Sequence, residues 1–183
     1  MSKLIARFVI ETLISSKTRI KLLLKFFLNS ETRAHLRSLA DEYNESTNSI
    51  RLELNRLEDA KLLLSEMQGN KKVFGANVKH PLFSDLSNII MKYVGIDKII
   101  SSIVENLGKV QKVYLTGDFA LGINSDLIEM IIVGDIDKKY LIELIKKGEK
   151  LVKKKLKILV FSPQEFEVND YSDKKKFLLC WDN

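Results

Sequence analysis

Three segments with helical hydrophobic spacing follow one another with only short breaks, and this arrangement restricts the fold more than any other feature of the sequence. They are residues 16–29, 32–43 and 47–60, in which apolar side chains recur three and four residues apart. Ser30 precedes the second segment, where its hydroxyl can cap the first backbone N–H groups of a helix. Because the breaks are so short, we expect the three helices to pack against one another.

The hydrophobic period changes after the third helix. Residues 62–67 and 73–77 have the composition of two strands, and the polar segment between them, residues 68–72, contains Gly69. Three helices followed by a two-stranded hairpin is the element order of a winged helix-turn-helix, a motif that binds DNA. In that motif the third helix enters the major groove and the hairpin forms the wing.

Beyond Gly95 the sequence alternates between helical and strand patterns. The expected elements are helices over residues 96–107 and 138–155, strands over 110–116, 127–133 and 156–162, and one more strand or short helix over 174–181. This alternation indicates an α/β or α+β domain with a small sheet. A helix over residues 81–93 connects the halves. We therefore predict an α+β chain with two domains, residues 1–95 and 96–183.

The positive charge is concentrated in the first of these halves. Residues 1–95 hold 15 Lys and Arg against 10 Asp and Glu, whereas residues 96–183 hold 15 against 14, so the first half carries +5 of the net charge of +6. A basic half joined to a nearly neutral one suggests a polyanion-binding module. Surface lysines in contact with solvent are the alternative explanation.

Cysteine and histidine are too few and too scattered for a metal site. The chain has one cysteine, Cys180, and two histidines, His35 and His80, which lie far apart. We expect no metal, a buried structural thiol and a reducing, cytoplasmic compartment. The apolar run over residues 4–14 is shorter than a membrane span, so no membrane partner is expected. Its apolar side is predicted to pair with a second copy in a homodimer.

Short polar and basic side chains gather where a winged helix would meet DNA. The residues predicted to lie in the major groove are Thr47, Asn48, Ser49, Arg51 and Asn55. Those predicted to contact phosphates are Lys17, Arg19, Lys71 and Lys72. Double-stranded DNA is thus the expected partner. Ser46 or Thr47 could instead serve only as a helix cap, and Arg51 could pair with Glu53, Asn55 or Glu58 on a solvated face.

Residues 115–122 and 124–134 resemble the minimal nucleotidyltransferase fold, in which a strand leads into a Gly-Ser turn, a short helix and a strand with an Asp-x-Asp pair. Those two carboxylates hold Mg²⁺ on a nucleoside triphosphate. In the matching positions this chain has Asp118 for the serine after Gly117, Leu127 for the first Asp and Glu129 for the second. Asp126 points to the opposite face of the strand from Leu127.

The third carboxylate expected from this resemblance would fall within residues 157–161, which contain none. We therefore expect a degenerate site without catalytic residues or cofactor. The residues that would make up its remnant are Gly117, Asp118, Asp126 and Glu129. Two-metal phosphoryl transfer needs several closely placed oxygen ligands, and a single glutamate cannot supply them.

The chain as a whole resembles bacterial ArsR-type winged-helix transcriptional regulators fused to a nucleotidyltransferase-like domain. The residues that carry this resemblance are 16–19, 46–51, 53–57, 69–72, 80–83, 116–120 and Gly122. It implies sequence-specific DNA binding by a dimer with a non-catalytic C-terminal module, and it leaves a protein or small-molecule effector open. Two alternatives remain: an active nucleotidyltransferase working through Asp126 and Glu129, and a toxin-neutralising partner protein.

Overall fold

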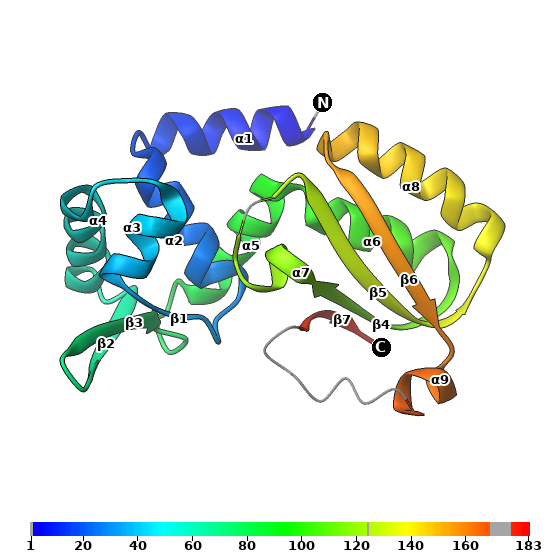
Figure 1. Cartoon of the computed structure of the whole chain (residues 1–183). Helices are drawn as coiled ribbons and strands as arrows, with labels where there is room; N and C mark the ends of the chain where they lie inside the picture. Colours follow the sequence, from blue (N-terminus) through cyan, green and yellow to red (C-terminus); the bar gives the residue numbers. More distant parts are fainter. Residues whose placement is uncertain (1, 124, 169–176) are drawn as a thin grey trace.

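The computed structural model of the protein describes residues 2–123, 125–168 and 177–183. It has a mixed α+β fold with two small sheets, one in each half of the chain (Figure 1). The first half supplies a group of helices and a three-stranded sheet. The second half supplies a four-stranded sheet with two long helices packed on it.

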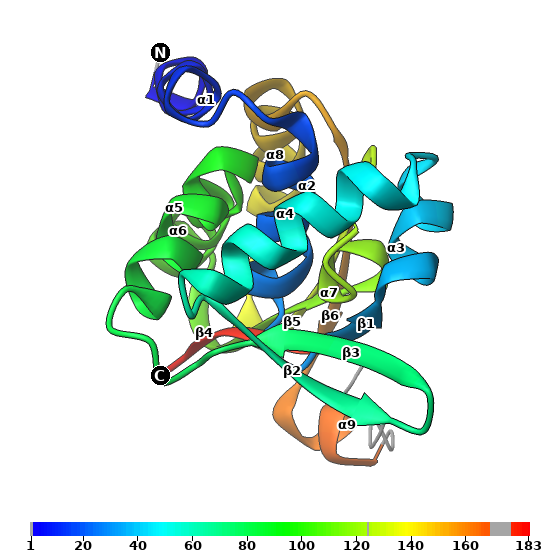
Figure 2. The ribbon, with the colours of Figure 1, turned by 90° about the vertical axis from the view of Figure 1, so that its left-hand side faces the viewer.

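The first half begins with two consecutive helices and ends with the helix that leads into the second half. Its elements are α1 (Ser2–Leu13), α2 (Lys17–Leu28), β1 (Arg33–His35), α3 (Leu36–Tyr43), α4 (Thr47–Asp59), β2 (Leu63–Gln68), β3 (Lys71–Ala76) and α5 (Phe83–Val94). The three strands are antiparallel, in the order β1-β3-β2. Figure 2 shows α4 across the face turned toward the viewer, with the hairpin of β2 and β3 below it.

The second half is built around a mixed sheet with the strand order β6-β5-β4-β7. Its elements are α6 (Ile96–Asn106), β4 (Gly108–Thr116), α7 (Gly117–Ala120), β5 (Leu127–Ile136), α8 (Lys138–Val152), β6 (Lys155–Phe161), α9 (Pro163–Val168) and β7 (Leu178–Asp182). Only β5 and β6 are parallel to each other, and α8 connects them. Helices α6 and α8 contact each other and cover one face of the sheet (Figure 1).

The helices and strands expected from hydrophobic period are present, and several begin at the capping residues that the sequence offers. The Ser16 hydroxyl accepts a hydrogen bond from the Arg19 N–H at the start of α2, and Ser46 accepts one from the Ser49 N–H at the start of α4. Gly95 ends α5 in the left-handed conformation, with φ of +84°. These helices therefore begin or end at residues whose side chain or backbone favours a helix terminus.

The second predicted helix is wrong at its start. We expected it over residues 32–43 with Ser30 as its cap, but residues 33–35 form β1, and α3 begins at Leu36. Strand β1 pairs with β3 through Ala34 and Phe74. This pairing with a strand 40 residues away overrides the local helical spacing, which the sequence alone does not reveal. His35 is the N-cap residue of α3 in place of Ser30, and its backbone N–H donates a hydrogen bond to the Ser38 hydroxyl.

The turn of the hairpin is shorter than expected. Gly69 and Asn70 make a two-residue turn with φ of +62° at Gly69, so Lys71 and Lys72 belong to β3 and do not form part of the turn. Helix α9 was not expected from the sequence. The expected tail element is strand β7, whereas residues 174–176 of that prediction lie outside the described residues.

One hydrophobic core continues through both halves of the chain. It joins Phe26 and Phe27 of α2 to Ile99 of α6 and Phe119 of α7. All eight residues from 22 to 29 are buried, so α2 is enclosed on all sides by the rest of the protein. The division into domains at residue 95 stays a prediction, since the core crosses it.

A close backbone contact joins the two halves at Gly122. Its φ is +70°, and a Cβ atom there would lie 2.4 Å from the carbonyl oxygen of Lys25 on α2. Nearby, the Asn29 side-chain amide donates a hydrogen bond to the Ala120 carbonyl. The contact leaves no room for a side chain, and the left-handed conformation disfavours one, so glycine suits this position.

The variant Gly122→Ala is expected to destabilise the protein more than Gly69→Ala. Both residues have a left-handed backbone, which costs a non-glycine residue about 1–2 kcal/mol, but a Cβ atom at Gly69 meets nothing within 4 Å. Overpacking against Lys25 should add about 1–3 kcal/mol at Gly122 alone. Urea unfolding of both variants measures this difference. Equal losses of unfolding free energy would show that the contact between the halves is looser than described.

Candidate functional site

The outer face of α4 presents four of the five side chains that the sequence predicted for the DNA groove. The exposed residues of this helix are Thr47, Asn48, Arg51, Leu52, Asn55, Arg56 and Asp59. Its opposite side is fixed in the core by Ile50, Leu54 and Leu57. Helix α4 itself lies at the outside of the molecule (Figure 2), and its mostly polar outer face is exposed to solvent.

Ser49 differs from the other predicted groove residues. It is half-buried, and its Oγ lies 3.4 Å from the Thr18 Oγ1 on α2. Its side chain therefore sits at the contact between α2 and α4, away from the exposed face of α4.

The buried carboxylate of Glu53 holds α4 against α2. Its Oε2 lies 2.7 Å from Nε of Arg19 on α2, and its Oε1 lies 3.1 Å from Nη1 of Arg56, one turn along α4. Burial raises the pKa of Glu53, but hydrogen bonds from Arg19 and Ser16 and the charges of Arg19 and Arg56 together hold this pKa below its ordinary value. Glu53 is therefore a charged clamp between the two helices.

A second carboxylate, Glu45, reinforces the same contact from the turn before α4. It accepts a hydrogen bond from the Thr18 hydroxyl, and its Oε1 lies 2.6 Å from Nζ of Lys21. Burial raises the pKa of Glu45, and the hydrogen bonds from Lys21 and Thr18 outweigh that effect and lower it overall. Glu45 therefore joins the start of α4 to the first turns of α2.

These two clamps are not evident in the sequence. Pairing of Glu53 with Arg51 is wrong, because residues two apart on a helix face different sides, and Glu53 pairs with Arg19 and Arg56. One signal could have found it. Glu53 lies in the apolar stripe between Ile50 and Leu57, where a charged side chain needs a partner.

The predicted phosphate contacts are placed differently from one another. Lys17 is exposed in the first turn of α2, whereas Arg19 is bound to Glu53. Lys71 and Lys72 are neighbours on β3 and so point to opposite faces of the hairpin. The Lys72 ammonium lies 2.7 Å from Glu58 and 5.1 Å from the ring centre of Phe74, while Lys71 is exposed.

The second candidate region lies where β4 ends, α7 begins and β5 starts. It brings together two of the four predicted remnant residues, Gly117 and Glu129. A Cβ atom at Gly117 would lie 2.1 Å from Oε2 of Glu129, so this carboxylate lies directly over the glycine. The other two, Asp118 and Asp126, are exposed, and the Asp126 carboxylate is 3.9 Å from the Lys154 ammonium.

The Glu129 carboxylate, which faces Gly117, is paired with the ammonium group of Lys157. Lys157 of β6 stands opposite Glu129 in the parallel register, and its Nζ is 2.9 Å from the Glu129 Oε1. Leu127, two residues earlier on β5, supplies no oxygen. Within the described ranges, no three acidic, histidine or cysteine side chains converge as metal ligands. These residues therefore do not fit a two-metal centre.

Histidine and cysteine have structural places. The ring of His35, the N-cap residue of α3, lies 2.8 Å from the Ser38 hydroxyl in the first turn of that helix, and the ring of His80 accepts a hydrogen bond from the Leu82 N–H. Burial raises the pKa of the Cys180 thiol to about 12, so it stays protonated.

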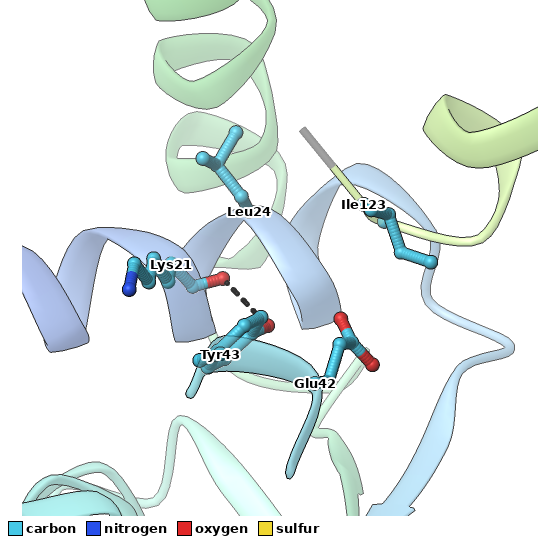
Figure 3. Close-up of a pocket in the computed structure, with 6 residues that line it drawn as sticks. Lys21, Leu24, Glu42, Tyr43 and Ile123 are labelled. Carbon is cyan, nitrogen blue, oxygen red and sulfur yellow. Dashed lines mark hydrogen bonds between the residues drawn. The ribbon is translucent and has the colours of Figure 1, made fainter. Parts of the chain in front are cut away.

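A cavity of about 250 Å³ lies between α2, α3 and the segment after α7 (Figure 3). Its lining residues are Lys21, Leu24, Glu42, Tyr43, Gly122 and Ile123. Tyr43 donates a hydrogen bond to the Lys21 carbonyl at 3.3 Å, and Glu42 pairs with Lys25 at 2.8 Å. Burial, with the charges of Glu42 and Glu45, raises the pKa of Tyr43. The polar groups around the cavity are therefore bonded to the protein itself.

Comparison with known proteins finds little. No protein-family profile and no curated protein matches the chain. Among solved structures, it is similar to a chain in the crystal structure of a mutant of the toxin–antitoxin MntA–HpeT, with a TM-score of 0.38 and 17% identity over 49% of this chain and 73% of that chain. No helix among the described residues is long and apolar enough to cross a membrane.

The variant Glu53→Gln is expected to lower the unfolding free energy at pH 7 by about 1–3 kcal/mol, because a neutral amide replaces a charged, hydrogen-bonded group. A carboxyl whose folded pKa is lowered stabilises the protein above its unfolded pKa, and this contribution is lost as the pH falls through the folded value. The parent should therefore lose more stability than the variant on acidification below the ordinary pKa of 4.5.

Chemical denaturation between pH 7 and pH 3 measures this effect. The matched control is Glu143→Gln, since Glu143 is 65% exposed and 3.8 Å from Lys147, and should change stability by less than about 0.5 kcal/mol. A Glu53→Gln protein with the parent's stability and acid sensitivity would contradict the clamp.

Proposed function

We propose that the protein is a transcriptional regulator that binds double-stranded DNA in a sequence-specific manner, with α4 in the major groove. The observation that carries the proposal is the outer face of α4, where Asn48, Arg51 and Asn55 are exposed together while Glu53 holds the helix from behind. Amide and guanidinium groups are the side chains that pair with base edges in two hydrogen bonds. A helix fixed by a buried clamp can present them in a constant geometry.

The order and pairing of the neighbouring elements support a winged helix-turn-helix. Helices α3 and α4 are joined by the short turn at residues 44–46, and Asn44 has the left-handed conformation that ends α3. The hairpin of β2 and β3 follows directly, and β1 pairs with β3 as a third strand. In this proposal α4 is the recognition helix and the hairpin is the wing.

Two exposed lysines suit contacts with a phosphate backbone. Lys17 at the start of α2 and Lys71 on the hairpin are exposed. Arg19 and Lys72 would contact phosphates only by leaving Glu53 and Glu58, so we assign the backbone contacts first to Lys17 and Lys71. The net charge of +5 in residues 1–95 agrees with such a role.

We further propose a homodimer formed through α1. This helix packs on α5 and leaves Phe8 and Leu13 exposed at 71% and 74%. A second copy would cover these side chains and would place two recognition helices on one DNA, as a two-fold DNA site requires. A cytoplasmic location follows only from this DNA-binding role.

The first test is selection of bound DNA from a random pool, followed by titration of the selected site. Arg51→Ala is expected to weaken binding by about 1–3 kcal/mol, as for the loss of a bidentate base contact, without changing the melting temperature. The control is Lys146→Ala, which removes the same charge from the exposed side of α8. No enrichment of any sequence, or equal binding by all three proteins, would reject the proposal.

For the C-terminal half we propose a nucleotidyltransferase-like domain without transfer activity. The ion pair of Glu129 and Lys157 supports this, because an ammonium 2.9 Å from the carboxylate occupies the place in which a carboxylate-bound cation would lie. Asp118 would also repel a triphosphate at the start of α7.

Incubation with labelled ATP, GTP, CTP or UTP and Mg²⁺ or Mn²⁺ is expected to yield no labelled product. The control is the variant Glu129→Gln, which removes the carboxylate that lies over Gly117. Metal-dependent labelling by the parent that disappears in this variant would establish the alternative, an active nucleotidyltransferase. It would leave the DNA-binding part of the proposal unchanged, since that depends on α4.

A further inference from the structure

Leu52 lies in the middle of the outer face of α4 and is 53% exposed. All residues of α4 are described, and Leu52 is the one large apolar side chain among its exposed residues. The others, Ile50, Leu54 and Leu57, are buried. Leu52 adds little to the core, and exposing its apolar surface to water is unfavourable. A residue that points away from the core on a conformationally fixed helix is available to an external partner.

The neighbours of Leu52 on the helix surface are polar. Asn48 lies one turn before it, and Asn55 and Arg56 lie one turn after it, at the i−4, i+3 and i+4 positions that share a helix face. On α4 itself the exposed apolar surface is therefore that of one side chain. A stable protein interface needs about 800 Å² from each partner with an apolar centre, and a single leucine among amides and guanidinium groups does not provide one.

The major groove of DNA fits this pattern. Its floor is a row of hydrogen-bonding atoms in which the C5-methyl group of thymine is the apolar feature. A leucine between an asparagine and an arginine on one helix face matches a methyl group that lies between base edges able to form hydrogen bonds.

We propose that Leu52 determines specificity by packing on the C5-methyl group of a thymine at one position of the bound site. This inference rests on the proposed function. It adds a contact of a different kind from those of Asn48, Arg51 and Asn55, because it reads a methyl group and not a hydrogen-bonding edge. The bound site should therefore contain a thymine whose methyl group contributes to the affinity for this protein.

Deoxyuridine substitution tests this contact, because deoxyuridine differs from thymidine only by the absence of that methyl group. The selected DNA site is prepared with each thymine replaced in turn, and each DNA is titrated with the parent protein and with Leu52→Ala. At one position the replacement should weaken parent binding about 3- to 10-fold. Leu52→Ala should bind the unmodified site more weakly by a similar factor and should be insensitive to the replacement at that position.

The other thymines are internal controls, since a methyl group that Leu52 does not contact must have the same effect on both proteins. Because Leu52 is exposed, the variant should keep the parent's melting temperature. If no thymine shows a methyl effect that depends on Leu52, the inference is wrong while the selected site still supports DNA binding, and a protein partner becomes the occupant of this face. If no DNA sequence is selected at all, the proposed function fails with it.

Discussion

The position of α4 depends on a carboxylate inside the protein. Glu53 occupies a core-facing position in α4, and leaving its charge without partners there would cost several kcal/mol. Arg19 and Arg56 provide the partners, one from α2 and one from α4 itself. The ion pair with Arg19 is directional, so it fixes the rotation of α4 as well as its distance from α2. The outer residues of α4 acquire a defined orientation from this inner contact.

Helix α2 transmits that constraint to the rest of the molecule. It is buried along residues 22–29, and it contacts the turn before α4 through Lys21 and Glu45. On another side its backbone at Lys25 lies against Gly122, in the segment that follows α7. The same helix therefore positions the candidate DNA-binding face and the start of the second half. A change in the packing of Gly122 would therefore act on α2, which contacts α4 directly.

Much of the fold could be predicted from the sequence because hydrophobic period reports which side of an element is buried. This was sufficient for α2, α4, the hairpin and the alternating elements after Gly95. It failed at residues 33–35, whose conformation is decided by pairing with β3 and not by local spacing. The same limit applies to the candidate site: the residues of the exposed α4 face follow from helical geometry, but the bond between Arg19 and Glu53 joins residues 34 positions apart.

The contact between Glu129 and Lys157 shows how parallel pairing of two strands can change the chemistry of a site. Neither residue predicts the other in the sequence, yet the register of β5 and β6 places them opposite each other. The pair is partly exposed, with 27% and 59% of the two side chains accessible, so it contributes at most about 1 kcal/mol to stability. Its larger effect is on charge, because it neutralises the carboxylate nearest to Gly117. The second half also packs against α2 through Gly122, and α2 is the helix whose Arg19 binds the Glu53 carboxylate of α4.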